Sequence, residues 1–284
     1  MNTLLELVSW PKSLFRIPKK WEINFSPRFL SYVPTHEIYI ETNKYILKSA
    51  QRHILDELFE LRYQIFLEDG TEDEEINYDV DQYDHICDHI VIIDKETNRI
   101  VGTYRLLSSD WTEHFYSQNE FYLDRFLIQA GVKIELGRAC IHHGHRNGAV
   151  IDLLWRGIGE YCMKTNAKYL FGCSSVKTTL RKDALQLMSY FESQENLASQ
   201  YCVHPIGKFD MKILDQEISN FYSKNEMSKE LVPPLLRSYL MAGAKVHGAP
   251  ALDIDFHCID FLTIMDLNNL NPSYRKRYFK VQND

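Results

Sequence analysis

The stretch VKIELGRACI, residues 132–141, carries the strongest fold signal in the chain. It reads as a β-strand, and residues 149–164 follow it with apolar side chains at helical spacing. Residues 168–173, KYLFGC, then read as a second strand. A strand, a helix and a strand within about 42 residues predict a βαβ crossover with two parallel neighbouring strands.

The segments on either side extend this unit into a mixed sheet. Two β-like runs, His89–Asp94 and Arg99–Leu107, are separated by four turn residues and predict an antiparallel hairpin. Tyr45–Phe66 and Pro233–Ala242 are predicted helices, and Cys258–Leu267 is a predicted buried strand. The expected class is therefore α/β (α+β), a mixed central sheet flanked by helices around the βαβ unit at about 132–173.

Composition narrows the class of protein. The 284 residues are 45% hydrophobic and 25% charged, which is typical of a globular protein, and the net charge of −7 argues against a nucleic-acid-binding body. Six separated cysteines without a CxxC pair favour a reduced, cytoplasmic protein. No apolar run approaches 18 residues, so we expect no membrane span.

Charge is unevenly distributed along the chain. Residues 1–28 hold five Lys or Arg and two Glu, a net charge of +3, so the rest of the −7 chain carries −10. Trp10, Phe15 and Trp21 lie among these basic residues. We expect two parts: a basic aromatic arm over residues 1–40 and a single domain over residues 41–284.

Glu135 and Arg138 place two charges inside an otherwise apolar strand. Three residues apart on a regular strand, they would point to opposite faces, but a β-bulge at Gly137 would bring both to one face. One interpretation is a buried ion pair or two residues at a rim. The other is a carboxylate placed in a cleft as a proton acceptor, with the arginine holding its orientation.

An acidic run, Asp79-Val80-Asp81-Gln82-Tyr83-Asp84, is a second candidate. It would ordinarily be solvated, and it lacks the glycine and terminal glutamate of an EF-hand calcium loop. Arg62 and Arg105 are the expected counter-charges. If these groups meet, they form an ion network that organises a cleft near Glu135.

The loop from His142 to Ala149 is a third candidate because it leads into the predicted helix. Backbone N–H groups at a helix N-terminus attract phosphate, and Arg146 would assist. The three histidines of this loop lack a plausible fourth zinc ligand nearby, so we expect no metal.

Taken in order, several segments resemble a known group of enzymes over about residues 45–267. Strand, loop, helix and strand around Glu135 to Cys173 look like the donor-binding half of a GNAT-type acyltransferase. More specifically, the chain resembles N-acyltransferases of the ornithine-lipid-synthase type, whose fold is shared with acyl-homoserine-lactone autoinducer synthases. The matching segments are LRYQIF at 61–66, DQYD at 81–84, CDH at 87–89, VGTYRLL at 101–107, ELGR at 135–138, LLWRGI at 153–158, FGCSS at 171–175, PPLLRSYL at 233–240 and DFL at 260–262.

The resemblance implies transfer of a (3-hydroxy)fatty acyl group from a thioester to the α-amino group of an amino acid, with ornithine favoured. Acyl carrier protein is the implied donor and coenzyme A thioesters are the alternative, because Arg146-Asn147-Gly148-Ala149 is a degenerate pyrophosphate loop. No bound cofactor is expected. The implied residues are Glu135, Arg138 and, as a rival base, His89 for catalysis; Arg62, Asp81, Asp84, Arg105, Cys173, Ser174 and Asp260 for substrate; and Arg146, Asn147, Gly148 and Ala149 for the donor's phosphopantetheine.

Two other functions remain open at this point. One is an autoinducer synthase, or another N-acyl amino acid synthase, which would be recognised by its product. The other is a membrane-associated binding protein without turnover. Because acyl carrier proteins are acidic, the basic arm and the segment Tyr274–Tyr278 are candidate docking surfaces, and the arm also suits the anionic inner face of the cytoplasmic membrane.

Overall fold

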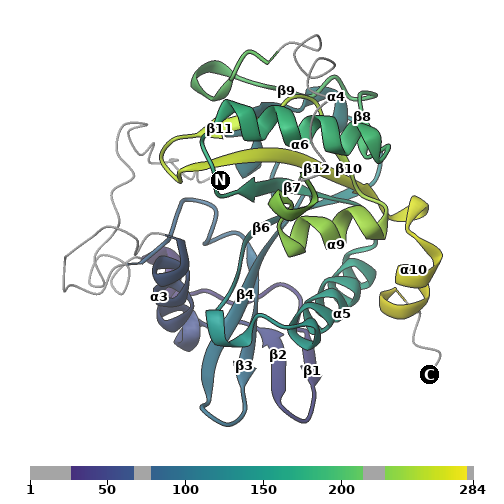
Figure 1. Ribbon diagram of the computed structural model, residues 1–284. Helices are drawn as coiled ribbons and strands as arrows, with labels where there is room; N and C mark the ends of the chain where they lie inside the picture. Colours follow the sequence, from purple (N-terminus) through teal and green to yellow (C-terminus); the bar gives the residue numbers. More distant parts are fainter. Residues whose placement is uncertain (1–26, 67–77, 214–227, 280–284) are drawn as a thin grey trace, which may run out of the picture.

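The computed structural model describes residues 27–66, 78–213 and 228–279. Ten strands of these residues form one mixed sheet in the order β1-β2-β3-β4-β6-β7-β12-β10-β8, with β11 pairing to β12. Helices cover both faces: α3 lies on one side of the β1–β4 half and α5 on the other (Figure 1). The predicted α+β class with a mixed sheet is therefore confirmed.

The strands of the main sheet have these bounds: β1 Tyr39–Glu41, β2 Tyr45–Ser49, β3 Asp88–Asp94, β4 Arg99–Ser108, β6 Val132–Ile141, β7 Ala167–Val176, β8 Leu197–Ala198, β10 Lys245–His247, β11 Ala251–Asp253 and β12 Cys258–Asp266. A separate two-stranded ribbon pairs β5, Phe121–Tyr122, with β9, His204–Pro205.

The helices are α2 Pro27–Leu30, α3 Leu55–Phe66, α4 Asp124–Leu127, α5 Gly148–Thr165, α6 Arg181–Ser193, α8 Ser228–Leu231, α9 Pro234–Ala242 and α10 Pro272–Tyr278. Short 3₁₀ turns lie at η1 Arg52–Ile54, η2 Tyr116–Asn119, η3 His143–His145, η4 Gly207–Phe209 and η5 Leu267–Asn269.

The βαβ crossover forms where the sequence predicts it, with β6 and β7 parallel and α5 between them. The side chain of Asn147 caps the start of α5, and Asn166 ends the helix in the left-handed conformation at φ 51°. Leu153, Leu154 and Ile158 bury the apolar face of α5 against the sheet. This packing holds the start of α5 at the end of β6.

Two points of the predicted secondary structure need correction. The predicted helix Tyr45–Phe66 begins only at Leu55, because Tyr45–Ser49 alternates its buried side chains and pairs with β3 as strand β2. The sequence reading missed α6, whose buried residues lie at Ala184, Leu187, Met188 and Phe191.

The segment Tyr274–Tyr278, a candidate docking surface by its basic sequence, is part of a packed helix. In α10 the ring of Tyr278 stacks on Trp155 of α5 at 5.7 Å. Arg275 donates to the carbonyl of Leu267, and Arg277 pairs with Asp152 at 2.6 Å. Much of the positive charge of this segment is therefore engaged within the protein.

The division at residue 40 stays a proposal. The first 26 residues of the predicted arm lie outside the described residues. Strand β1 straddles the proposed boundary, at Tyr39–Glu41, and joins the main sheet through β2. We therefore propose that the single domain begins before β1, with the arm confined to the residues ahead of it.

Candidate active site

A fork between β6 and β7 forms the centre of the candidate site. The two strands pair with each other only from Val132 to Glu135 on β6. Beyond that point β6 stays paired with β4, and β7 stays paired with β12. Gly172 lies at the fork, where an added Cβ would be 2.3 Å from the carbonyl oxygen of Leu136. Beyond the fork, the facing edges of β6 and β7 do not pair with each other, so their backbone groups can bind the amides of an extended ligand.

A β-bulge on β6 lies just beyond the fork. Thr103 pairs with Cys140 and Arg105 with Gly137, so β6 holds one more residue than β4 over this step. Arg138 occupies the bulge at φ 50°. This is the left-handed region, which a residue with a Cβ adopts only at a cost in conformational free energy. Glu135 and Arg138 both contact the η2 turn, so the predicted bulge and the shared face are confirmed.

Glu135 and Arg138 do not form the buried ion pair that was one interpretation. The carboxylate of Glu135 accepts hydrogen bonds from the backbone N–H groups of Tyr116, at 2.9 Å, and Ser117, at 2.7 Å. Arg138 pairs instead with Asp79 at 3.1 Å and Asp81 at 3.3 Å. Glu135 is 4% exposed, and burial raises its pKa while the hydrogen bonds from Ser117 and Tyr116 lower it.

The expected ion network is present and more extensive than the sequence indicated. Arg62 of α3 donates to Asp84 and Asp79, each at 2.7 Å, and Arg105 of β4 donates to both oxygens of Asp81 at 2.8 Å. With Arg138, three arginines face three aspartates, so the network has no net charge. It joins the 79–84 loop to α3, β4 and β6. Burial raises the pKa of Asp84, but Arg62 and Arg105 outweigh it and hold that pKa far below its ordinary value.

His89 lies under this network and does not suit the role of base. It is fully buried, and its Nε2 lies 2.9 Å from the carbonyl oxygen of Asp84. Burial lowers the pKa of His89 to about 4, so the ring is a weak proton acceptor at pH 7. We therefore assign His89 to the support of the 79–84 loop.

A second group of charges, three buried carboxylates, lies next to the fork. Glu120 follows η2, Asp253 ends β11 and Asp260 lies on β12, with one oxygen of each within 4.8 Å of the others. Asp260 accepts hydrogen bonds from the Ser175 hydroxyl at 2.5 Å and the Cys258 thiol at 3.4 Å. These carboxylates are about 3% exposed or less.

Burial makes the three carboxylates easier to protonate than ordinary aspartate and glutamate side chains. Burial, followed by repulsion from Asp260 and Asp253, raises the pKa of Glu120 well above its ordinary value. Burial likewise raises the pKa of Asp260 and of Asp253. Such a set favours binding of a cation, since a cation would relieve the repulsion among the carboxylates. A hard metal ion or a substrate ammonium would meet this need.

The side chain of Cys173 joins this carboxylate group from β7. Its thiol donates to the Ser117 hydroxyl at 3.5 Å and to Glu120 at 3.7 Å. Burial raises the pKa of Cys173 well above its ordinary value and that of Cys140 to about 12. Both thiols are thus protonated at pH 7, which fits packing and hydrogen bonding better than nucleophilic attack.

Ser174, expected beside Cys173, lies on the opposite face of the sheet. Alternation along β7 points it away, and its hydroxyl accepts a hydrogen bond from Thr263 at 2.9 Å. Ser175 takes the expected place near Asp260. The sequence reading also missed Glu120 and Asp253, because their segments, NEFY and ALDID, do not resemble any ligand-binding motif.

Arg138 lies between the two charged groups. Its guanidinium is 4.9 Å from the ring centres of both Tyr116 and Phe256. It pairs with the ion network and also lowers the pKa of Glu120. The bulge therefore holds a cation beside the carboxylate group without neutralising it.

The predicted donor loop lies at the end of β6, where α5 begins. The side chain of Asn147 accepts hydrogen bonds from the backbone N–H groups of Ala149 and Val150, both at 3.1 Å. Arg146 is exposed and donates to the carbonyl of Ile141 at 3.0 Å. Two N–H groups that could bind a pyrophosphate are thus occupied by the protein itself.

The structure has the features that the GNAT-type resemblance implied: the parallel strands β6 and β7 separate beyond Glu135, and the crossover helix α5 begins after the end of β6. A family model described as "Acetyltransferase (GNAT) domain" matches residues 61–156, which span α3 to the middle of α5. The protein is a GNAT-fold acyltransferase, as the resemblance implied.

The chain is also similar to curated proteins named L-ornithine N(alpha)-acyltransferase. It is 28% identical to the one from Rhizobium meliloti (strain 1021), over 77% of this chain and 78% of the relative. It is 27% identical to that of Brucella abortus (strain 2308), over 88% of this chain and 90% of the relative. These relatives confirm the resemblance seen in the sequence.

Among solved structures, the chain is similar to the acyl-homoserine-lactone synthase LasI, with 15% identity, a TM-score of 0.44 and coverage of 88% of this chain and 99% of that one. It is also similar to FeeM, an N-acyl amino acid synthase from uncultured soil microbes, with 8% identity, a TM-score of 0.44 and coverage of 83% and 96%.

Replacement of Glu135 by glutamine tests its structural role. In Glu135→Gln an amide NH₂ must face the N–H of Tyr116 or Ser117, leaving a buried donor without an acceptor. We expect the free energy of unfolding to fall by about 1–3 kcal/mol. Urea unfolding measures this, with the exposed Glu113→Gln as the matched control. An unfolding curve for Glu135→Gln equal to that of the control would contradict this role.

Proposed function

We propose that the protein transfers a 3-hydroxyacyl group from acyl carrier protein to the α-amino group of ornithine, as a step in the synthesis of an ornithine lipid. The observation that carries the proposal is the similarity to L-ornithine N(alpha)-acyltransferases over 77–88% of the chain. The buried carboxylates Glu120, Asp253 and Asp260 support a cationic acceptor. Ornithine brings two ammonium groups, which suits an anionic pocket.

In the proposed reaction, the acyl-pantetheine arm enters the fork and its carbonyl lies near the parting of β6 and β7. The amine nitrogen attacks the thioester carbon, the C–S bond breaks, and the thiolate leaves and takes up a proton. Backbone N–H groups at the fork and the bulge stabilise the oxyanion. No covalent enzyme intermediate is needed, which agrees with the raised pKa of Cys140 and Cys173.

The proton of the attacking amine needs an acceptor. The sequence assigned this step to Glu135, but in the structure both of its oxygens accept backbone N–H groups and hold η2. We propose instead that Glu120, paired with Asp260, accepts the proton, because its raised pKa makes it a better base at neutral pH. Glu135 and Arg138 are then positioning residues, which hold η2 and the bulge around the fork.

Acyl carrier protein is proposed as the donor because the N-terminus of α5 is capped by Asn147 within the chain. A coenzyme A thioester would need that position for its pyrophosphate. The phosphopantetheine of acyl carrier protein has a single phosphate instead, and that phosphate is bonded to the carrier protein. The proposed carrier surface includes Arg146, which is exposed at this end of the fork. The basic arm of residues 1–28 is a proposed site of peripheral contact with an anionic membrane.

The substrates are tested with purified protein and a matrix of donors and acceptors, with products detected by mass spectrometry. The donors are 3-hydroxyacyl carrier protein and the matching coenzyme A thioester, and the acceptors are ornithine, lysine, glutamine, glycine and S-adenosylmethionine. We expect N-acylornithine, formed faster from the carrier protein. A lactone from S-adenosylmethionine would instead indicate an autoinducer synthase, and failure of every acceptor would refute the proposal.

Ornithine binding should release protons. In the free protein Glu120 and Asp260 have raised pKa values, so below these values they carry protons, and a bound ammonium lowers the same pKa values. Affinity for ornithine should therefore rise with pH until the carboxyls are ionised in the free protein. Calorimetry in two buffers of different ionisation enthalpy counts the released protons. Proton uptake on binding, or affinity that falls from pH 6 to pH 8, would contradict the assignment.

A further inference from the structure

A buried apolar cluster borders the fork on the face of the sheet opposite the carboxylate group. Leu136 follows Glu135 on β6, and Leu170 precedes Phe171 on β7; Glu135 and Phe171 both contact the η2 side. Because successive residues of a strand point to opposite faces, Leu136 and Leu170 face away from η2. They belong to one buried cluster with Tyr239 of α9.

Helix α9 is held over this cluster by its contacts with α5. The Trp155 indole N–H donates to the Ser238 hydroxyl at 2.6 Å, and the ring of Tyr239 meets the Trp155 ring edge-on at 5.7 Å. Figure 1 shows α9 between α5 and α6. The helix carries most of the segment PPLLRSYL, which is part of the family resemblance and has no role in the reaction as described so far.

The hydroxyl of Tyr239 is buried without a hydrogen-bond partner among the described residues, and the side chain is 7% exposed. Other polar groups of the same cluster are satisfied, since Trp155 donates to Ser238 and the Tyr161 hydroxyl to Asp88. A buried donor left unpaired is costly, so such a group calls for an explanation. A ligand that brings a polar atom into the cluster would supply the missing partner.

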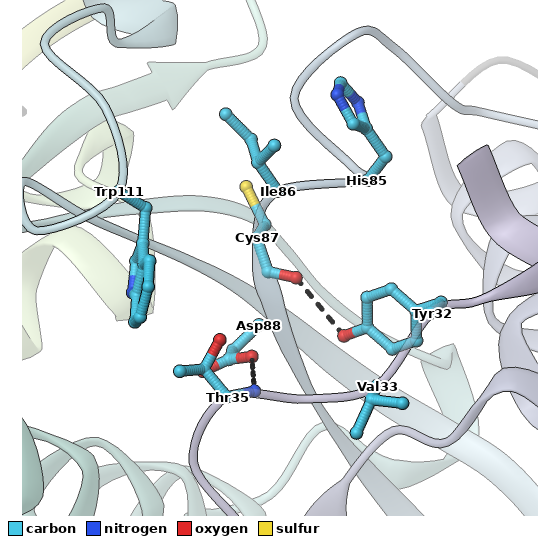
Figure 2. A pocket seen from close by; sticks show the side chains of 8 residues that line it. All are labelled: Tyr32, Val33, Thr35, His85, Ile86, Cys87, Asp88 and Trp111. Carbon is cyan, nitrogen blue, oxygen red and sulfur yellow. Dashed lines mark hydrogen bonds between the residues drawn. The ribbon is translucent and has the colours of Figure 1, made fainter. Parts of the chain in front are cut away.

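The surface cavity shown in Figure 2 differs in this respect. It measures about 240 Å³ and lies between the chain that follows α2 and the start of β3. Asp88 at its floor accepts from the N–H of Thr35, at 2.6 Å, and from the Tyr161 hydroxyl, at 2.9 Å. The Tyr32 hydroxyl donates to the carbonyl of Cys87 at 3.2 Å. The floor of that cavity is satisfied within the protein, whereas the Tyr239 hydroxyl is not.

The proposed substrate has one hydrocarbon part, and the two faces of the sheet suit it differently. On the η2 face, Glu120 and Asp260 need a cation or polar partners, so a hydrocarbon chain there would leave them unsolvated. On the opposite face, Leu136 and Leu170 offer apolar surface beside the fork. The 3-hydroxyl is carried two carbons beyond the thioester carbon, so it enters the cluster close to the fork.

We propose that the Tyr239 hydroxyl hydrogen-bonds the 3-hydroxyl of the acyl donor and thereby selects 3-hydroxyacyl chains over unsubstituted ones. The acyl chain runs from the fork into the apolar cluster under α9, and Trp155 holds the Tyr239 ring in place. The inference rests on the proposed function, to which it adds a specificity-determining residue for the donor.

The donor preference of the purified full chain tests this assignment. The donors are 3-hydroxyacyl and unsubstituted acyl carrier protein of equal chain length, with ornithine as acceptor, and kcat/KM is measured for each. We expect wild type to prefer the 3-hydroxyacyl donor and Tyr239→Phe to lower that preference about tenfold or more. The loss should fall on the 3-hydroxyacyl donor alone, because phenylalanine keeps the ring and removes only the hydroxyl.

The matched control is Tyr190→Phe, which makes the same change on a half-buried residue of α6 and should keep the wild-type preference. In urea, Tyr239→Phe should be at least as stable as wild type, because the hydroxyl that it loses is unpaired in the free protein. A clear loss of stability would mean that the hydroxyl already has a partner there, and would overturn the inference.

Wild type alone supplies a second test. A hydroxyl fixed by its ring reaches the 3-hydroxyl of one enantiomer better than that of the other, so the (3R) and (3S) donors should react at clearly different rates. Equal rates would overturn the inference. If wild type transfers from no donor, the proposed function fails and the inference with it. If wild type transfers from both donors and Tyr239→Phe keeps the wild-type preference, the inference alone fails.

Discussion

Glu120→Gln is expected to lower kcat for N-acylornithine formation by about 10²–10⁴-fold, the range for loss of a positioned general base. Glutamine keeps the shape of the side chain but cannot take the proton of the attacking amine. It also removes one charge from the group of Glu120, Asp253 and Asp260, so the KM for ornithine should rise. Steady-state kinetics with 3-hydroxyacyl carrier protein measures both constants.

Two comparisons separate this expectation from a general loss of structure. Glu113→Gln makes the same chemical change on an exposed residue and should leave both constants unchanged. Glu135→Gln should lose stability, and its remaining activity should keep the pH profile of wild type. Two results together would contradict our assignment: Glu120→Gln keeps its activity, and folded Glu135→Gln no longer shows the rise of kcat with pH that ionisation of the base causes. Glu135 would then be the proton acceptor.

Arg62→Met should lower the free energy of unfolding by about 3–5 kcal/mol, the usual cost of removing one partner from a buried ion pair. Arg62 is fully buried and donates to Asp79 and Asp84, so its loss leaves two carboxylates without their nearest cation. The matched control is Arg99→Met on the surface pair with Glu57, which joins the two side chains at 2.8 Å. That change should cost no more than about 1 kcal/mol.

The cost of Arg62→Met should also depend on pH. The pKa of Asp84 is lowered in the folded protein, so its stabilising contribution is present above the ordinary aspartate range and is lost as the pH falls through the lowered value. Without Arg62 the buried aspartates should take up protons at higher pH, which removes part of the penalty. Urea unfolding at pH 7 and pH 4 should thus give a smaller difference from wild type at pH 4. An equal or larger difference there would contradict the network.

Patterns of residues close together in the sequence predicted β6, α5 and the bulge, the elements that form the fork. Residues 132–141 alternate as a strand, the apolar face of residues 149–164 is regular, and Gly137 signalled the bulge. Each of these depends on residues close together in sequence, and the structure has β6, α5 and the bulge in those places. The meeting of Arg62 and Arg105 with the 79–84 aspartates was also predictable, because buried charges require partners.

Long-range pairing determined what the sequence did not reveal. Tyr45–Ser49 has apolar residues that suit a helix or a strand, and pairing with β3 decides for the strand. Glu120 and Asp253 are more than 130 residues apart and meet only because η2 and β11 both end beside β12. The resemblance implied that Ser174 binds substrate together with Cys173, whereas strand alternation puts the two side chains on opposite faces.

The central claim is that the α-amino group of ornithine attacks the carrier-bound thioester. The most direct measurement supplies ornithine labelled with ¹⁵N at the α position together with 3-hydroxyacyl carrier protein, and locates the new amide by NMR and mass spectrometry. We predict an amide proton coupled to the labelled nitrogen, and one free carrier thiol for each product. An amide on the unlabelled side-chain nitrogen, or carrier thiol released without an N-acyl product, would contradict the account.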